Sequence, residues 1–148
     1  SWSLLDYYRK PKPAYEVVRR LFEPLLISID CAPQRFQAGD EIRPEVWIIN
    51  DRAEPIPGCQ VKVVLWNGTG QPVEHLILAV DVAADSAAVV GRRCWTLPEG
   101  GGWRLTGRLT QGSRVLASNA YDLSAYDGLE PTLGQRLWTW LTGWITPA

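Results

Sequence analysis

Carboxylates and the single histidine are the side chains of this sequence that could act in acid–base catalysis. Asp40 and Glu41 are adjacent, but consecutive residues of a strand or turn point apart, so they do not form a working pair. His75 has no acidic residue or thiol at a spacing typical of a catalytic triad. Five further carboxylates of the middle region fall at expected strand ends or in turns, where they are solvated: Asp51, Glu54, Asp81, Asp85 and Glu99. We therefore expect no catalytic residue in this chain.

Metal and cofactor motifs are missing from the sequence as well. The three cysteines, Cys31, Cys59 and Cys94, have no CxxC spacing, and a single histidine without clustered ligands argues against a transition-metal site. The glycine run "PEGGGW" at 98–103 joins two expected strands and opens no helix, so it is not a phosphate loop. We predict no metal, no cofactor and unpaired, buried thiols.

Asparagine and tryptophan provide the two remaining signals of binding or modification. "NGT" at 67–69 fits a glycosylation sequon and also an ordinary hairpin turn, and we favour the turn. Four tryptophans lie in expected strands: Trp47, Trp66, Trp95 and Trp103. Aromatic faces stack on sugar rings, so a row of exposed tryptophans would indicate a carbohydrate-binding module. Burial in a core is favoured because each tryptophan contributes a large apolar area.

Length, charge and hydropathy restrict the class of protein. A chain of 148 residues suits one domain with an appendage. The net charge of −1 lacks the basic excess typical of nucleic-acid binding. The sequence has no apolar run of 18 residues and no signal-peptide pattern at its start. We expect neither nucleic acid nor membrane as a partner, and unpaired cysteines favour a cytoplasmic location.

The middle of the chain has the pattern of a β-sandwich. Short runs rich in Val, Ile, Leu and Trp alternate with Gly, Pro, Asn and Asp clusters at intervals of about ten residues. They predict seven strands, at 25–30, 41–49, 59–66, 73–82, 87–97, 103–110 and 114–123. No helical segment separates them, so we expect antiparallel sheets in an immunoglobulin-like sandwich. Pro44 predicts an edge or a bulge early in the second strand.

Strict alternation identifies the inward-facing residues of two of these strands. The residues expected in the core are Val61, Val63, Leu65, Trp103, Leu105 and Leu109, because charged or polar residues separate them.

Helical patterns flank the expected sandwich. Residues 13–22 predict a helix that begins after Pro11 and ends before Pro24. Its apolar residues cover more than one narrow stripe, so we expect neighbours on two sides, at least one of them outside this sequence. Residues 128–148 predict a tryptophan-rich C-terminal helix. We expect it to cap the sandwich or an upstream part of a larger protein, with a membrane-surface helix or a self-association surface as alternatives.

The first thirty residues carry a motif. Ser1, Trp2, Ser3, Asp6, Tyr7, Lys12, Pro13 and Tyr15 match the pattern Ser-Trp-Ser-x-x-Asp-Tyr-x-x-x-x-Lys-Pro-x-Tyr. With these residues the chain resembles the closing segment of β-mannosidase-like members of glycoside hydrolase family 2. In that family the motif leaves the eighth strand of a catalytic (β/α)8 barrel, continues into the last barrel helix and is followed by an immunoglobulin-like sandwich.

The resemblance implies three regions and a role. Residues 1–24 would end the barrel, 25–127 would form the sandwich, and 128–148 a C-terminal helix or tail. Tyr15, Val18 and Phe22 would pack on the barrel, and Trp2 would line the active-site mouth of the complete enzyme only. The chain would be a non-catalytic module that supports the barrel of an enzyme cleaving β-linked sugars, with its own barrel as partner and self-association through exposed helix faces. A carbohydrate-binding module with its own polysaccharide affinity is the alternative.

Overall fold

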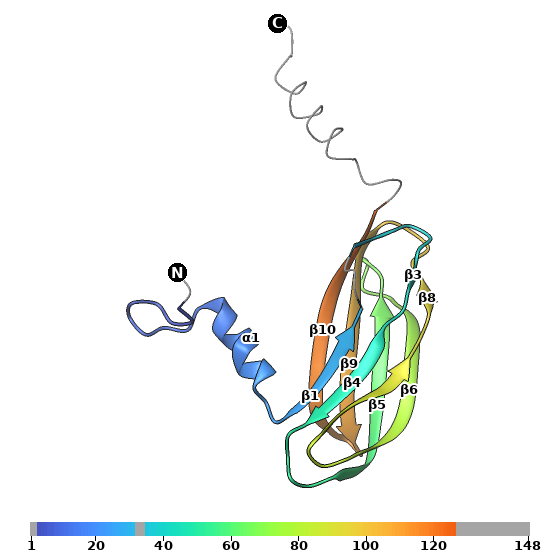
Figure 1. Ribbon diagram of the computed structural model, residues 1–148. Helices are drawn as coiled ribbons and strands as arrows, with labels where there is room; N and C mark the ends of the chain where they lie inside the picture. Colours follow the sequence, from blue (N-terminus) through green and yellow to red (C-terminus); the bar gives the residue numbers. More distant parts are fainter. Residues whose placement is uncertain (1–2, 32–34, 127–148) are drawn as a thin grey trace, which may run out of the picture.

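The computed structural model describes residues 3–31 and 35–126, which form one helix followed by ten strands (Figure 1). In chain order they are α1 (Pro13–Leu21), β1 (Leu25–Asp30), β2 (Arg35–Gln37), β3 (Glu41–Ile42), β4 (Glu45–Asn50), β5 (Ile56–Trp66), β6 (Pro72–Val82), β7 (Ser86–Arg92), β8 (Trp95–Thr96), β9 (Gly101–Gln111) and β10 (Arg114–Tyr126). Trp2 and the expected C-terminal helix lie outside the described residues.

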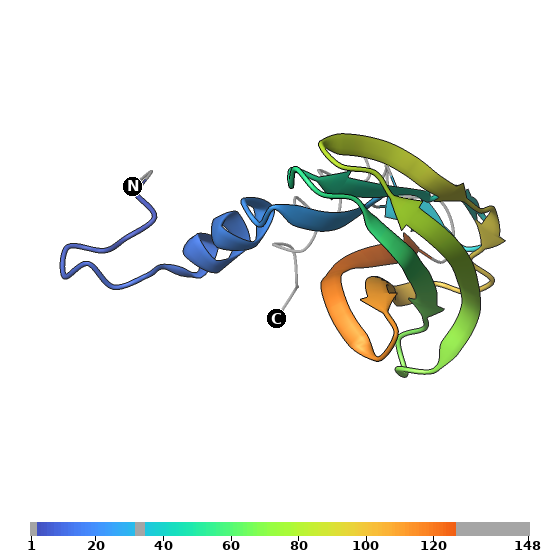
Figure 2. The same cartoon turned by 90° about the horizontal axis from the view of Figure 1, so that it is seen from below.

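The strands form two facing sheets, as the sequence predicts. One sheet has the order β1-β4-β7 and the other β2-β10-β9-β5-β6, with β3 and β8 as a separate short pair. The two sheets lie one over the other, and α1 with the loop before it projects to one side of them (Figures 1 and 2). The fold is therefore a mainly β, immunoglobulin-like sandwich.

The core lies between the sheets and contains the residues that alternation predicts. Val61, Val63 and Leu65 of β5 are buried, and so are Trp103, Leu105 and Leu109 of β9. They meet the inward side of β1, where Ile27 and Ile29 are buried. Gly107 leaves room for this contact, because a Cβ there would lie 3.0 Å from the Cδ1 atoms of both isoleucines.

Two expected strands are each broken in two. The stretch 41–49 divides at Arg43 and Pro44 into β3 and β4, and 87–97 divides into β7 and β8. The breaks lie side by side, since the Arg93 N–H donates to the Pro44 carbonyl at 3.3 Å. Proline has no N–H for a ladder, so the pairing is interrupted where Pro44 enters it. The irregularity expected at Pro44 is thus confirmed, and seven expected strands become ten with the addition of β2.

The sheets are antiparallel except at β2, which is a correction to the expected topology. Residues Arg35–Gln37 pair in parallel with Ser124–Tyr126 of β10, whereas β1 pairs with β4 in the other sheet. The chain therefore changes sheets between β1 and β2. With three residues, β2 is too short to produce a readable alternation.

Side chains of β10 form hydrogen bonds with backbone groups along the open edge of β1. The Tyr121 hydroxyl accepts the Ile29 N–H at 3.3 Å and the Asn119 Nδ2–H at 2.9 Å. Asn119 Nδ2 also donates to the Ile27 carbonyl at 3.2 Å. Because an edge strand otherwise leaves such groups unpaired, these bonds hold the two sheets together along this side.

Candidate functional site

The segment before α1 is a turn that presents two tyrosines to solvent. Asp6 closes it, since its Oδ1 accepts the Lys10 N–H at 2.8 Å. Tyr7 and Tyr8 pack edge to face with their ring centroids 5.3 Å apart, and they are 93% and 78% exposed. The motif residue Asp6 therefore stabilises this turn. The side chain of Tyr7, by contrast, is almost fully exposed to solvent.

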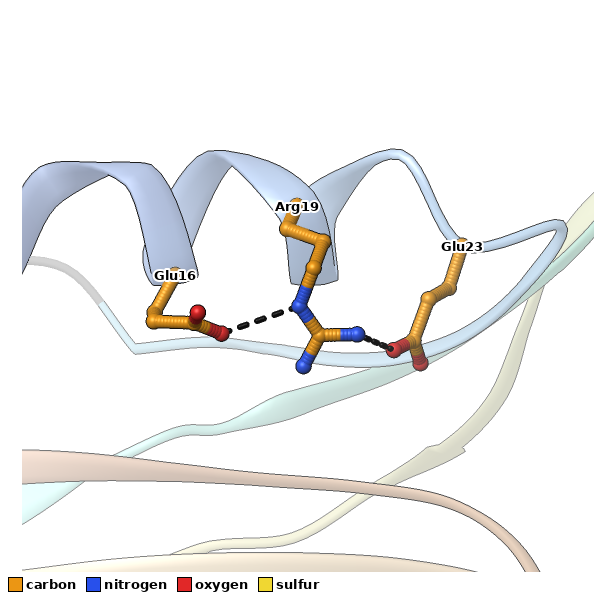
Figure 3. Close-up of polar contacts among 3 residues, drawn as sticks. All are labelled: Glu16, Arg19 and Glu23. Atoms are coloured by element: carbon orange, nitrogen blue, oxygen red, sulfur yellow. Dashed lines mark hydrogen bonds and ion pairs between the residues drawn. The ribbon is translucent and has the colours of Figure 1, made fainter. Parts of the chain in front are cut away.

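One side of α1 is polar. Helix formation starts with Pro13, which fits the first helical position because its missing N–H would have had no partner there. The Arg19 guanidinium contacts Glu16 at 2.9 Å and Glu23 at 3.6 Å, as Figure 3 shows. The hydrogen bond to Glu16 and its negative charge raise the pKa of Arg19. This polar ladder of Glu16, Arg19 and Glu23 confines the apolar residues to the rest of the helix surface. The expected neighbours on two sides of the helix stay a prediction.

The opposite side of α1 is apolar and lacks a cover. We define the apolar face of α1 as Tyr15, Val17, Val18, Leu21 and Phe22, which follow helical spacing away from the ladder. No residue of the helix is buried, and Val17, Leu21 and Phe22 are 58%, 56% and 83% exposed. Tyr15 and Val18 are half-buried.

The helix turns polar residues, not its apolar face, toward its own sandwich. Arg20 and Glu23 line a hollow of about 490 Å³ together with residues of β9 and β10. An amphipathic helix in a folded protein normally packs its apolar side on the core. The apolar face of α1 therefore has no packing partner among the described residues.

The outward face of the three-stranded sheet is also apolar. Leu26 pairs with Ile49, and Trp47 with Val89, on the side opposite the buried Ile27, Val46 and Ile48. Leu26, Trp47, Ile49 and Val89 are all half-buried. This surface follows α1 directly in the chain, because β1 begins four residues after the helix.

The four tryptophans of the described strands do not form an exposed row. Trp95 and Trp103 are buried in the core, as favoured, whereas Trp47 and Trp66 are half-buried. These two belong to β4 and β5, which lie in different sheets. Trp66 lines a hollow of about 630 Å³ at the end of the five-stranded sheet. No pattern in the sequence predicts this hollow, because strands distant in sequence build it.

The cysteines have three different environments. Cys59 is buried and Cys31 half-buried, but Cys94 is exposed, which corrects the expectation of three buried thiols. Cys94 lies in the break between β7 and β8, next to the buried Trp95, so it points the other way. Burial, with the charge of Asp30, raises the pKa of the Cys31 thiol to about 11.

Four hollows in the described region each lack a pair of carboxylates. Each hollow is lined by a single one: Asp30, Asp122, Glu23 or Asp40. Within residues 3–31 and 35–126, no group of three or more His, Cys, Asp or Glu could hold a metal. The helix of this region is too short to cross a membrane.

Asn67 forms the expected turn, with its side-chain oxygen accepting the Thr69 and Gln71 N–H groups at 3.2 and 2.8 Å.

Comparison with curated proteins finds β-mannosidases. The chain is 26% identical to β-mannosidase B of Aspergillus niger over 87 residues, which cover 55% of this chain and 10% of the enzyme. It is 23% identical to β-mannosidase B of Emericella nidulans over 117 residues, covering 64% of this chain and 14% of the enzyme. The chain thus spans about a tenth of the length of the curated relatives it matches. No family model matches it.

Solved structures share the fold. An exo-chitosanase of Amycolatopsis orientalis superimposes with a TM-score of 0.68 and 21% identity, over 83% of this chain and 14% of that enzyme. A β-glucuronidase of glycoside hydrolase family 2 superimposes with a TM-score of 0.54 and 14% identity, over 70% of this chain and 13% of that enzyme.

The sequence matches and the shared sandwich agree with the opening motif. This chain is homologous to part of the β-mannosidases of glycoside hydrolase family 2.

Proposed function

We propose that this chain is a non-catalytic module of a longer family 2 glycoside hydrolase, the parent enzyme, and that it supports the catalytic barrel. The apolar face of α1 would be its main contact with the barrel, with Tyr15, Val18 and Phe22 as packing residues. This proposal is supported by the homology to β-mannosidases and by the small share of their length that the chain spans.

The uncovered apolar face of α1 is the observation that carries the proposal. Burial of a Val, Leu or Phe side chain stabilises a protein by about 1.5–3 kcal/mol relative to exposure. Val17, Leu21 and Phe22 forgo most of this gain here, since more than half of each is exposed. The exposed Tyr7 of the motif and the outward face of β1 and β4 would extend the same contact.

The distribution of carboxylates supports a non-catalytic role. A retaining glycosidase uses two carboxyl groups about 5–5.5 Å apart, one as acid/base and one as nucleophile. Each of the four hollows described above has one carboxylate, and Asp122 in the hollow beside Trp66 is paired with Arg104 at 3.6 Å. The catalytic pair of the parent enzyme would lie in its barrel, at the carboxyl ends of the strands.

The substrate class of the parent enzyme is proposed from the relatives. Both fungal relatives named above are β-mannosidases, so we propose cleavage of β-linked sugars with mannose as the first candidate. The loops that choose the sugar would belong to the barrel.

Substitution of exposed apolar residues in the parent enzyme tests the proposal. Val17→Ser with Phe22→Ser should leave the sandwich of the isolated chain folded, because neither side chain is buried in it. In the parent enzyme the same pair should lower thermal stability and β-mannosidase activity together. Arg19→Ser, on the polar side of α1, is the matched control and should change both properties little.

Three results would contradict the proposal. The first is an unchanged parent enzyme after the double substitution. The second is hydrolysis of p-nitrophenyl β-mannoside by the isolated chain. The third is a stable, concentration-dependent dimer in the parent enzyme that depends on Phe22, since α1 would then serve self-association instead of barrel support.

A further inference from the structure

The hollow beside Trp66 has the composition of a small-ligand site. Its volume of about 630 Å³ falls in the range of ligand pockets, about 300–1,000 Å³. It is lined by the last residues of β5, the first of β9 and the end of β10, so three neighbouring strands and the 67–70 turn build it. Gly68, Gly70 and Gly102 keep side chains out of it.

Trp66 offers an oriented aromatic surface there. Its Nε1–H donates to the Thr106 hydroxyl at 2.8 Å, so the position of the indole is fixed and its only polar group is already used. The side chain is half-buried and lies on the outward side of β5, because the neighbouring Leu65 points into the core. What remains available to a ligand is apolar ring surface.

Charged groups lie at the rim of the same hollow. Arg104 and Asp122 are opposite each other on β9 and β10, 3.6 Å apart, with side chains 58% and 80% exposed. Arg104 supplies several N–H donors and Asp122 supplies acceptors, and being exposed both can turn toward a ligand at little cost. Opposite charges side by side favour a neutral ligand with many hydroxyl groups over an anion or a cation.

We propose that this hollow binds a neutral oligosaccharide, with the apolar face of one sugar ring on Trp66 and its hydroxyls on Arg104 and Asp122; that the sugar is β-linked rests on the substrate class proposed above. Pyranose rings with mostly equatorial hydroxyls present axial C–H groups on a face and hydroxyls at the edge, which matches an aromatic wall with a polar rim. A single tryptophan in a hollow accommodates a short segment or a chain end, unlike the flat row of tryptophans considered from the sequence. The site lies on the sandwich and not on α1. A failure to bind sugar would therefore leave the proposed barrel support untouched, and a failure of barrel support would leave this site untouched.

Titration of the purified chain with β-1,4-mannohexaose, followed by tryptophan fluorescence and by the indole N–H signals in NMR, tests this site. We expect saturable binding within about 10 mM, with the largest shift at the Trp66 indole signal. Cellohexaose differs from mannohexaose in the configuration at C2 of each sugar, so a comparison of the two shows whether the site distinguishes these epimers. Saturable binding of either sugar at Trp66 supports the site.

Substitutions distinguish binding at this site from non-specific binding elsewhere on the chain. Asp122→Ala changes an exposed side chain and should weaken binding at least about tenfold without unfolding the chain. Trp66→Phe, which keeps an aromatic cover, should also weaken it. Trp47→Phe is the matched control in the other sheet and should leave affinity within about twofold. Absence of saturable binding of both sugars, or equal affinity in the Asp122 and Trp47 variants, would overturn the proposal.

Discussion

Asn50 at the end of β4 is the polar side chain for which we expect the largest effect of an isosteric substitution. It is 0% exposed, and its Nδ2 donates to the Glu54 carbonyl at 3.1 Å and to the Ala83 carbonyl at 2.8 Å. Its Oδ1 accepts the Arg52 N–H at 3.2 Å. One amide therefore joins the loop after β4 to the turn between β6 and β7.

Asn50→Asp keeps the shape but replaces the donor with an oxygen that faces two carbonyls. Two hydrogen bonds are lost at about 0.5–1.5 kcal/mol each, and a carboxylate is buried without a donor for that oxygen. We expect the free energy of unfolding to fall by about 2–4 kcal/mol at neutral pH. Burial raises the pKa of such a carboxyl group above its unfolded value, so the loss is complete above the folded pKa and shrinks as the pH falls and the group is protonated.

Urea unfolding followed by tryptophan fluorescence, at neutral and at acid pH, measures both effects relative to the natural sequence. Asn67→Asp is the matched control, because the described hydrogen bonds of the Asn67 side chain all use its oxygen. It should change the free energy of unfolding by less than about 0.5 kcal/mol. Equal midpoints for the two variants, or a loss in the Asn50 variant that grows on acidification, would refute this reasoning.

Four further predictions concern the core, the sheet edge and two of the thiols. Gly107→Ala should lower the free energy of unfolding by about 1–3 kcal/mol, measured by urea unfolding, because its Cβ would crowd β1 at 3.0 Å. Tyr121→Phe should cost about 1–2 kcal/mol and speed hydrogen exchange of the β1 amide that its hydroxyl accepts, seen by NMR. At pH 8 a thiol reagent should modify the exposed Cys94 first, as peptide mass mapping would show. Between about pH 9 and 11 the unfolded Cys31 ionises while the folded thiol does not, so stability should fall there, and less so in Cys31→Ala.

The core could be predicted because its signal is local. Each residue of a strand points opposite to the next, so Val61 and Leu65 are assigned to one face without knowledge of the partner strand. The opening motif predicted the relationship to β-mannosidases for a similar reason, since it lies within fifteen consecutive residues.

Features that depend on distant partners could not be predicted. Asn50 appears as an ordinary strand-end polar residue, and only the approach of the carbonyl of Ala83, 33 positions away, makes it a core residue. The hydroxyl of Tyr121 reaches β1 across 92 positions. The hollow beside Trp66 likewise requires the register of β5, β9 and β10, which no periodicity specifies.

The orientation of α1 shows the same limit. The spacing of Glu16, Arg19 and Glu23 already places them on one side of a helix, but only the structure shows the ion pairs that join them (Figure 3) and which side of α1 faces the sandwich. Its consequence, an apolar face turned away from the sandwich, supports the proposed contact with the barrel.

Hydrogen exchange of the α1 amides tests that contact most directly, with the isolated chain and the parent enzyme compared under the same conditions. Short helices without tertiary contacts are marginal in water, so the α1 amides of residues 14–21 should exchange nearly unprotected in the isolated chain. In the parent enzyme they should be strongly protected, and Val17→Ser with Phe22→Ser should remove that protection while Arg19→Ser does not. Equally fast exchange of α1 in both proteins would contradict the account.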